Sequence, residues 1–442
     1  MDFIPHTDTE IQEMLSAIGV RSLGDLFKDI PAEIPRKKLC LPEALSEQEL
    51  IKEMESLGAK NVSTKNYDSY LGAGSYEHFI PSVVQSLVNR SEFVTAYTPY
   101  QAEASQGILQ SIYEYQSLIC ALTGMDVSNA SMYDGATSLT ESLLVAYRAK
   151  EIYGGNIIIS KTIHPEYRDV IKTYFNAFPV EIIEAPYFNG TTDMQFIKEH
   201  INDNTVAVAL QSPNFFGCLE RAWEIPELAK RHGALSVLCA NPISLGIIKD
   251  PGRMGFDIAV GEGQPLGNPI SFGGPYLGYF ACKKELARKM PGRIVGRTKD
   301  SRGDQGFVLT LQTREQHIRR EKATSNICSN EALCALTACV YLATVGKRGI
   351  EELAKLNVSL SHYAKGKLCA IPGVSSPFSA PYFNEFVLKI DVPEEKYLSE
   401  KIIPGLCLEK FYPDLNGCSL WCVTETKTKK QIDMLAEVAA CK

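Results

Sequence analysis

Between residues 156 and 283, short apolar runs alternate with segments of helical periodicity. The runs NIIIS (156–160), TVAVALQ (205–211) and DIAVG (257–261) are apolar at nearly every position, which is typical of strands buried on both faces. Helices between such strands bring successive strands parallel. The pattern therefore predicts an α/β fold with a mostly parallel sheet flanked by helices. The full series is strands at 156–160, 180–185, 205–211, 235–240, 257–261 and 277–283, with helices at 165–178, 193–201 and 225–233.

The sequence on either side predicts further domains. A chain of 442 residues is too long for one simple core. We expect an N-terminal helical arm over 1–70, a large α/β domain over 71–310, and a linking helix with a small C-terminal α+β domain over 311–442. The helical segments expected outside the central pattern lie at 9–28, 43–57, 105–122, 137–154 and 329–346, and the strands expected in the small domain lie at 384–390 and 418–424.

Charge and composition argue against several classes of protein. The net charge of −7 disfavours nucleic acid or an anionic membrane as the main partner. The first residues lack a basic segment followed by an apolar one, so we expect no signal peptide. No apolar stretch approaches the roughly 20 residues that span a bilayer. The thirteen cysteines form no CxxC pair, and we expect no metal site. We therefore expect a cytoplasmic protein.

The stretch YDGATSLTE contains a glycine turn that opens a helix. Such a turn exposes free backbone N–H groups at the positive end of the helix dipole, which suits a phosphate. Asp134, Gly135 and Thr137 would line that site. The alternative is an ordinary helix cap formed by Asp134 or Thr137, and Ser138 with Glu141 fits a capping box.

The stretch YTPYQAEASQG concentrates aromatic and amide side chains just before a predicted helix. Tyr97, Tyr100, Gln101, Ser105 and Gln106 would line a polar pocket there. The alternative is a solvated connection in which the two tyrosines pack against the surface.

Three further stretches have both a functional and a structural interpretation. LGAGSYEHFIP contains His78, which is a candidate site residue or a hydrogen-bonded structural histidine. LQTREQHIRREKATSNI contains Arg314, which suits bidentate binding of a carboxylate or phosphate, although a charge run is usually a solvated helix face. QSPNFFGCLE follows a strand, so Asn214 would project into a ligand crevice or belong to a turn with buried aromatic residues.

Gln264 lies in the loop GEGQPLG, directly after the predicted strand at 257–261. Ligands of open α/β sheets gather at the carboxyl ends of the strands, so a catalytic group is expected there. A glutamine amide cannot form an imine, and at ordinary pH it neither takes up nor releases a proton. The loop therefore has the position of an active site without the residue that would do the chemistry.

Taken together and in order, these motifs resemble the P-protein of the glycine cleavage system, glycine dehydrogenase (decarboxylating). The resemblance runs nearly end to end, from MLSAIGVRSLGDLF (14–27) into the C-terminal domain. The length matches the N-terminal half of the long P-protein, which implies the alpha-type chain of the two-chain form. The resemblance implies the fold type I pyridoxal-phosphate transferase architecture.

The resemblance also gives a meaning to the Gln264 loop. Fold type I enzymes carry the imine-forming lysine near this place, and an aspartate at the end of the preceding strand holds the pyridinium nitrogen. This chain has Gln264 and Asn241 there. An amide carries no charge to stabilise a protonated ring nitrogen. The resemblance therefore implies a degenerate cofactor pocket, with pyridoxal phosphate carried by the beta chain. The pocket residues are Asp134, Gly135, Thr137, Asn214, Asn241 and Gln264.

The implied activity, glycine dehydrogenase (aminomethyl-transferring), belongs to the pair of chains. Glycine loses CO2, and the aminomethyl group passes to the lipoyl arm of the H-protein. An α2β2 assembly is expected, with a functional link to the T-protein and L-protein. Sites of this fold form at dimer interfaces, so this chain is expected to contribute residues in trans. The candidates are Tyr97, Thr98, Tyr100, Gln101, Ser105, His78 and Arg314.

Two alternatives remain open for function. The chain could be a non-catalytic scaffold for its partner, or a self-sufficient pyridoxal-phosphate enzyme that uses another lysine, such as Lys283 or Lys284. Cys328 is either a redox-sensitive thiol near the site mouth or a buried free thiol.

Overall fold

The structure is a computed structural model that describes residues 5–31, 34, 40–323, 325–327, 330–391 and 393–441. Cys328 lies outside the described residues. The chain divides into two compact units, residues 1–62 and 63–442. The domain borders expected at residues 70 and 310 stay predictions.

The first unit contains helices α1 (Asp8–Ile18) and α2 (Glu47–Gly58) and the 3-10 helix η1 (Leu23–Phe27). Both α-helices begin at capping boxes, in which Thr7 pairs with Glu10 and Ser46 pairs with Glu49. The predicted helical segments at 9–28 and 43–57 are confirmed. The apolar side chains of α2, which include Leu50, are exposed, so this helix has an amphipathic face and no core of its own.

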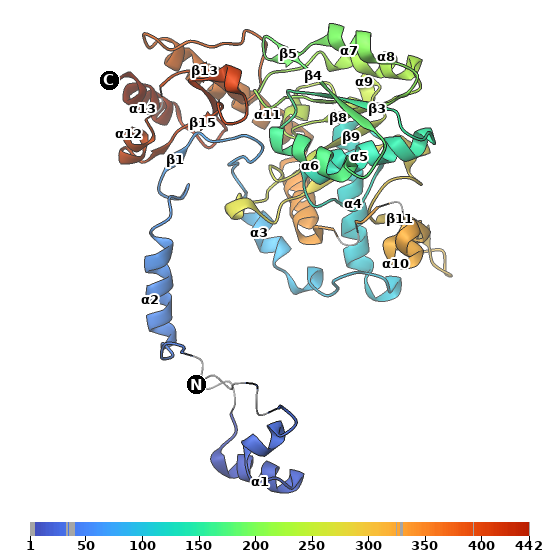
Figure 1. The fold of residues 1–442 in the computed structure, drawn as a ribbon, viewed down its shortest axis with the longest axis vertical. Coiled ribbons are helices and arrows are strands. Elements are labelled where there is room, and N and C mark those ends of the chain that lie inside the picture. The colour runs from blue at the N-terminus through green and yellow to red at the C-terminus, as the bar shows by residue number, and fades with distance from the viewer. Residues whose placement is uncertain are drawn as a thin grey trace. The chain divides into compact units, whose positions relative to one another are not determined.

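The second unit is built on a seven-stranded sheet with the order β2-β10-β9-β8-β7-β3-β4 (Figure 1). Strands β4, β3, β7, β8 and β9 are parallel, and β10 and β2 are antiparallel to their neighbours. The predicted mostly parallel sheet is confirmed. The strands are β2 (Val127–Ser128), β3 (Asn156–Ser160), β4 (Glu181–Ala185), β7 (Thr205–Gln211), β8 (Leu235–Cys239), β9 (Ile258–Glu262) and β10 (Gly278–Cys282).

Helices cover both faces of this sheet, which explains why its strands are apolar throughout. Ile158 belongs to a core cluster with residues of α4 and α11, whereas its neighbours Ile157 and Ile159 belong to a second cluster with residues of α5 and α6. The helices of this unit are α3 (Ser82–Val88), α4 (Gln106–Thr123), α5 (Gly135–Lys150), α6 (Pro165–Phe175), α7 (Met194–His200), α8 (Ile225–Arg231), α9 (Pro251–Met254), α10 (Gln316–Arg319), α11 (Ala332–Cys369), α12 (Glu394–Ser399) and α13 (Lys429–Ala440).

The C-terminal part contains a small antiparallel sheet with the order β13-β16-β15. Trp421 of β16 is fully buried in a cluster formed with α11 and α13. The predicted strands at 384–390 and 418–424 are confirmed. The remaining strands are β1 (Asp68–Ser69), β5 (Tyr187–Phe188), β6 (Thr191–Thr192), β11 (Ile294–Lys299), β12 (Gln305–Thr310), β13 (Glu385–Lys389), β14 (Ile402–Ile403), β15 (Leu406–Cys407) and β16 (Cys418–Cys422).

Helix α11 differs most from its prediction, because it continues to Cys369 beyond the predicted end at residue 346. Gly346 interrupts it with non-helical angles, but the following residues keep helical spacing, and Ile350, Ala354 and Leu368 are buried. Among the described residues it is the one helix whose length and composition would allow a membrane span, which corrects the expectation that no apolar stretch approaches that length. Half of its most apolar 18-residue window is buried inside the protein, as in a core helix.

The opening of α5 also differs from one expectation. Asp134 is the N-cap, and its side chain accepts a hydrogen bond from the backbone N–H of Thr137 (2.7 Å). Ser138 and Glu141 lie inside the helix, so the capping box predicted for them is wrong. Only one cap can begin a helix, and Asp134 occupies that position with extended backbone angles.

We predict that Gly217→Ala destabilises the second unit strongly. Gly217 has φ +78°, and a Cβ atom there would collide with the backbone carbonyl of Glu385 at the start of β13. Strain and collision together should lower the free energy of unfolding by about 3 kcal/mol. The matched control is Gly373→Ala, at φ +91° in open space, with an expected loss of about 1 kcal/mol. Unfolding followed by circular dichroism measures both losses, and equal losses would contradict the close-packing argument.

Candidate active-site region

Gln264 lies in the loop that follows β9, at the carboxyl edge of the parallel strands. Its side chain is 1% exposed and pairs with the backbone of a distant segment. The N–H of Tyr76 donates to Oε1 (2.9 Å), and Nε2 donates to the Tyr76 carbonyl (2.9 Å) and to the Asn268 carbonyl (2.7 Å). The amide therefore pairs with the Tyr76 backbone as a neighbouring strand would, and it is not directed at an open ligand site.

The carboxyl group of Glu262, the last residue of β9, lies at the start of α5. Its Oε2 accepts a hydrogen bond from the Gly135 N–H (2.9 Å), and its Oε1 accepts from the N–H groups of Gln264 (2.9 Å) and Leu277 (3.1 Å). Burial raises the pKa of this carboxyl group to about 7, although the three N–H groups lower it. The glycine turn thus has the anion that a helix N-terminus favours, and the anion is a side chain of the chain itself.

Aromatic side chains pack against the start of α5. A Cβ atom at Gly135 would lie 2.5 Å from the Tyr167 hydroxyl, so the tyrosine packs directly on the turn. Tyr167 stacks on the ring of His164, with centroids 4.8 Å apart. The His164 Nε2 bonds to the Ala73 carbonyl (2.8 Å), and burial lowers the pKa of this imidazole.

Asn241 and Asn214 make local contacts. The Asn241 Oδ1 accepts a hydrogen bond from the Ile243 N–H (2.9 Å), which closes a turn after β8. Asn214 is 1% exposed, and its amide donates to the Gly190 carbonyl (2.8 Å) and to Glu220 (2.7 Å). The structure therefore places Asp134, Gly135 and Gln264 around Glu262, whereas Thr137 contacts Asp134, and the contacts of Asn214 and Asn241 lie elsewhere.

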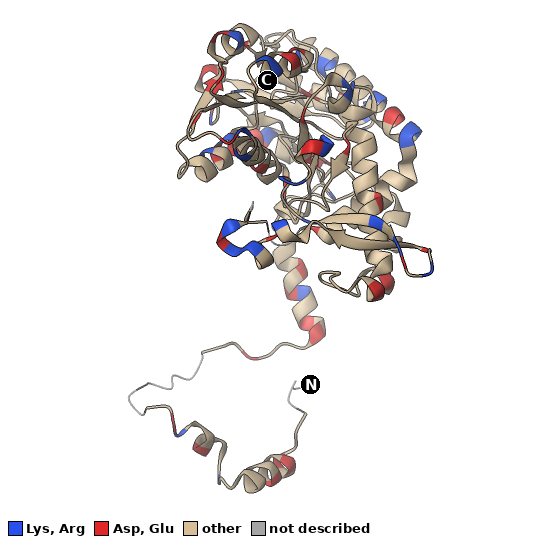
Figure 2. Cartoon of the chain, turned by 90° about the vertical axis from the view of Figure 1, so that its right-hand side faces the viewer, with Lys and Arg blue, Asp and Glu red and all other residues tan. Residues whose placement is uncertain are grey.

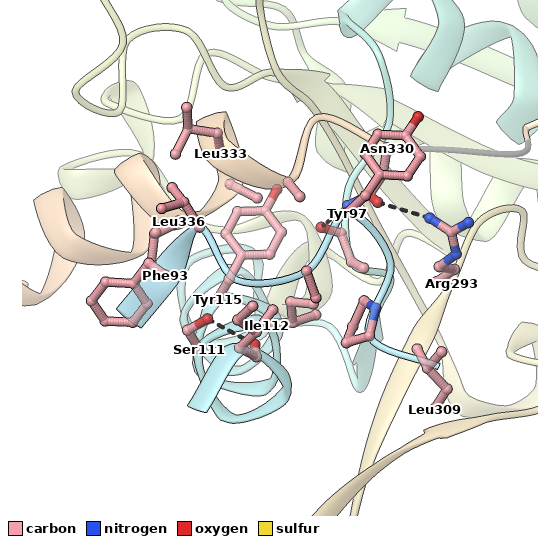
Figure 3. A pocket seen from close by; sticks show the side chains of 17 residues that line it. Phe93, Tyr97, Ser111, Ile112, Tyr115, Arg293, Leu309, Asn330, Leu333 and Leu336 are labelled. Carbon is pink, nitrogen blue, oxygen red and sulfur yellow. Dashed lines mark hydrogen bonds between the residues drawn. The ribbon is translucent and has the colours of Figure 1, made fainter. Parts of the chain in front are cut away.

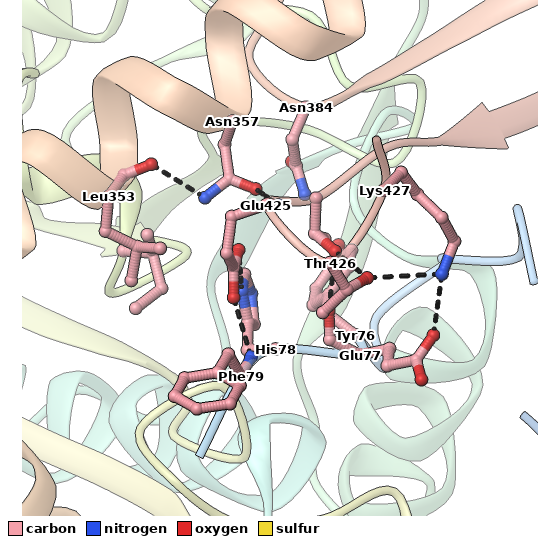
Figure 4. A network of polar contacts seen from close by, with 12 residues as sticks. Tyr76, Glu77, His78, Phe79, Leu353, Asn357, Asn384, Glu425, Thr426 and Lys427 are labelled. Atoms are coloured by element: carbon pink, nitrogen blue, oxygen red, sulfur yellow. Dashed lines mark hydrogen bonds and ion pairs between the residues drawn. The ribbon is translucent and has the colours of Figure 1, made fainter. Parts of the chain in front are cut away.

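His78 belongs to a strap, residues 70–81, that joins the large α/β part to the small C-terminal sheet (Figure 4). Its Nδ1 lies 2.8 Å from Glu425 Oε2. The Tyr76 hydroxyl donates to Glu385 Oε2 (2.7 Å), and the Ala73 N–H donates to Glu385 Oε1 (2.6 Å). Burial raises the pKa of Glu385 to about 7. His78 is therefore held in a structural contact between two parts of the fold.

Arg314 is also held by the backbone. It is 9% exposed, and its guanidinium donates to the carbonyls of Met290, Gly292 (2.9 Å) and Leu311 (3.1 Å). Burial lowers the pKa of this guanidinium. The other lysines and arginines of this stretch gather at α10 and the turn after it, as Figure 2 shows. Those side chains are exposed, whereas Arg314 is buried, so Arg314 is not part of that group.

The segment containing Tyr97 and Tyr100 lies at the surface. Tyr97 is 87% exposed and Tyr100 is 51% exposed. Tyr97 lines a mainly apolar cavity of about 270 Å³, together with residues of α4 and the start of α11 (Figure 3). Arg293, 7% exposed, enters this cavity and donates to Asn330 and to the Tyr100 hydroxyl, both at 3.4 Å.

The remaining residues of that segment differ in exposure. Thr98 is half-buried, and its carbonyl accepts from the Tyr100 N–H (2.9 Å). Gln101 is exposed and donates to Glu103 (2.7 Å), whereas Ser105 is buried at the start of α4. Tyr97, Thr98, Tyr100 and Gln101 therefore form one surface segment, and Ser105 anchors it.

The alternative lysines lie at the opposite edge of the sheet. Lys283 follows β10, whose end pairs with the start of β9, and its Nζ contacts Asp257 Oδ1 (2.6 Å). The Lys284 N–H donates to Asp126 (3.0 Å). The antiparallel direction of β10 places both lysines far along the sheet from the Gln264 loop.

Sequence reasoning missed Glu262, Tyr76 and Arg293. One signal for Glu262 was present, because a carboxylate at the end of an apolar strand needs hydrogen-bond donors when it is buried. The partners of Tyr76 and Arg293 come from distant parts of the chain, and no local pattern marks them.

The fold has close counterparts among solved structures. A sphingosine-1-phosphate lyase from Burkholderia pseudomallei is similar with a TM-score of 0.64 over 92% of this chain and 94% of the other, at 14% identity. A crystal structure of glycine decarboxylase (P-protein) of the glycine cleavage system, in inhibitor-bound form, has a TM-score of 0.89 and 41% identity, and covers 100% of this chain and 99% of the other. The chain therefore has the pyridoxal-phosphate transferase fold.

Sequence comparison is more specific. The family model for the glycine cleavage system P-protein matches residues 1–439. Chains named probable glycine dehydrogenase (decarboxylating) subunit 1 are 53% identical in Desulfitobacterium hafniense, over 98% of each chain, and 52% identical in Carboxydothermus hydrogenoformans, over 99% of each chain. The chain belongs to the glycine cleavage system P-protein family, and its similarity is to subunit 1.

Pyridoxal phosphate is the cofactor associated with this family and fold. The residues of this chain do not fit it at the expected place. Glu262 already occupies the start of α5, where the cofactor phosphate would lie, and a second anion there would be repelled. Gln264 has no amine for an imine, and its amide is fully hydrogen-bonded.

We predict that Gln264→Leu lowers stability by about 3 kcal/mol, because the N–H and carbonyl of Tyr76 would be left buried without partners. Urea unfolding followed by circular dichroism measures the loss. The control is Gln110→Leu on the exposed face of α4, where the amide contacts Glu114. An equal, small effect of both substitutions would show that the pairing with Tyr76 is dispensable.

We predict that Glu262→Gln changes how stability depends on pH. The pKa of Glu262 is raised from 4.5 to about 7 in the folded chain, so the folded state binds the proton more tightly than the unfolded state. As pH rises from about 4.5 to 7, the wild type should lose stability relative to the variant. Urea unfolding at pH 5 and pH 8 measures this difference. Glu227→Gln, a surface substitution, is the matched control, and a wild type–variant difference that stays constant between the two pH values would refute the prediction.

Proposed function

We propose that this chain acts as the alpha subunit of a two-chain glycine dehydrogenase (aminomethyl-transferring), in the cytoplasm. A beta subunit carries the pyridoxal phosphate, and the chains assemble as α2β2. Glycine loses CO2, and the remaining aminomethyl group passes to the lipoyl arm of the H-protein. The T-protein and L-protein then act on the product. This chain contributes residues in trans.

The single observation that carries the proposal is that Glu262 bonds the Gly135 N–H at the start of α5, where the phosphate of a cofactor is proposed to lie, and that the Gln264 amide is engaged by Tyr76. A member of the family in this form needs a second chain to supply the cofactor. The naming of the similar chains as subunit 1 supports the same arrangement.

The contacts within the chain rank the residues proposed to act in trans. Tyr97, Thr98, Tyr100 and Gln101 lie in a surface segment that a partner chain can reach. Their proposed task is to position groups at the partner's site and to exclude water, because side chains of this type supply hydrogen bonds and apolar surface. Of the buried candidates, Ser105 anchors that surface at the start of α4, whereas His78 and Arg314 are proposed to act indirectly, by holding Glu425 and the backbone of residues 290–292 in place.

The test of the proposal is glycine–bicarbonate exchange with pyridoxal phosphate and H-protein present. We expect no exchange with this chain alone and exchange after the beta chain is added. We also expect no visible imine absorption when this chain alone is mixed with pyridoxal phosphate. Exchange or an imine band in this chain alone would favour the self-sufficient alternative, in which another lysine serves.

Tyr97→Ala and Tyr100→Ala separate contribution in trans from a pure scaffold. We expect each to reduce exchange by about tenfold or more, because a misplaced reacting group lowers the rate steeply. Tyr153→Ala is the matched control, since Tyr153 is 92% exposed and lies after α5. Gel filtration establishes that each variant still assembles with the beta chain. Full turnover in assembled Tyr97 and Tyr100 variants would establish the scaffold.

A further inference from the structure

A polar cavity of about 390 Å³ lies beside the middle of α5. Glu141 and Arg148 line it from α5, and Tyr174 and Phe178 line it from the end of α6 and the turn after it. Ser325 and Asn326 lie on another side. None of these residues belongs to the Gln264 region or to the surface segment around Tyr97.

Glu141 carries an unsatisfied buried atom into this cavity. The residue is 1% exposed, and its Oε2 has no hydrogen-bond partner among the described residues. Burial raises the pKa of the carboxyl group to about 7, and the nearby Ser325 and Arg148 side chains lower it. Leaving a buried carboxyl oxygen without a donor is costly unless something else supplies the donor.

Arg148 presents the complementary problem. Its Nη1 is buried and has no hydrogen-bond partner among the described residues. Glu141 and Arg148 are seven positions apart and therefore lie on one face of α5. No ion pair within 4.0 Å joins them in the part of the chain that the structure describes. A carboxyl oxygen and a guanidinium nitrogen, each without a hydrogen-bond partner among the described residues, thus flank one space, which Glu321 also lines.

Part of the lining between the two charges is apolar. Leu144 lies between them on the same helix face, and the rings of Tyr174 and Phe178 form a wall. A ligand that satisfies this cavity has an ammonium group, a carboxylate group and a small apolar side chain. A cation alone would leave Arg148 without an acceptor, and an anion alone would leave Glu141 without a donor.

We propose that this cavity binds a free α-amino acid, with the ammonium group on Glu141 and the carboxylate on Arg148. The site is independent of the cofactor place and of the proposed exchange reaction. A bound amino acid would contact both α5 and residues 325–326.

Isothermal titration calorimetry of the full chain with L-leucine, L-alanine and glycine tests the proposal. The half-ligands are 3-methylbutylamine, which is leucine without its carboxylate, and 4-methylpentanoate, which is leucine without its ammonium group. We expect at least one amino acid to bind. If that ligand is L-leucine, each half-ligand should bind at least about tenfold more weakly, as expected for the loss of a charge-assisted hydrogen bond. For L-alanine or glycine, the corresponding amine and carboxylate serve in the same way. Absence of binding by all three amino acids, or a half-ligand that binds equally well, would overturn the proposal.

Variants assign the binding to this cavity. Glu141→Gln and Arg148→Met should each weaken binding by about tenfold or more. Glu53→Gln, on the exposed helix α2, is the matched control and should bind as the wild type does. Glu141→Gln should also unfold at a higher temperature than the wild type without ligand, since it removes a buried charge that lacks a partner. Undiminished binding in folded Glu141→Gln and Arg148→Met variants would place the ligand elsewhere and sink the proposal.

Discussion

The carboxylate of Glu262 is the contact on which the edge of the sheet depends. It accepts hydrogen bonds from the start of α5, from the loop after β9 and from the chain that enters β10. Three segments that would otherwise present free N–H groups to a ligand thus converge on one internal anion. A helix N-terminus favours such an anion, and the low dielectric of the site strengthens each of the three bonds.

The strap links the Glu262 region to the small C-terminal sheet by hydrogen bonds. Once the loop after β9 is fixed, Gln264 holds the backbone of Tyr76, and the Tyr76 hydroxyl reaches Glu385 in the small sheet. His78 and Glu425 add a second fastening a short distance along the strap. The position of the small C-terminal sheet is therefore coupled to Glu262 and the start of α5 through a continuous series of hydrogen bonds.

Much of the fold was predictable because its central strands are apolar on both faces, as in Ile157–Ile159, and helices separate them. The hairpin of β11 and β12 was not predicted, and the exposed Arg297 and Lys299 hide the period of a strand in β11. The Gln264 loop was located from its place after β9. Its true partner, Tyr76, is 188 positions away, and sequence periodicity carries no signal over such a separation. Likewise, the sequence marked His78 and Arg314 as candidates, but only tertiary contacts distinguish a satisfied buried group from an available one.

The contacts of the Gln264 loop constrain what a single substitution there could achieve. Gln264→Lys would place an amine in the loop, but it would also break the pairing with Tyr76. The Gly135 N–H at the start of α5 would still be held by Glu262. Opening this corner to an outside ligand would therefore take at least two substitutions, at positions 264 and 262, and the first of them weakens the fold. The packing thus opposes change at either position alone, because the groups that a ligand would need are already bonded within the chain.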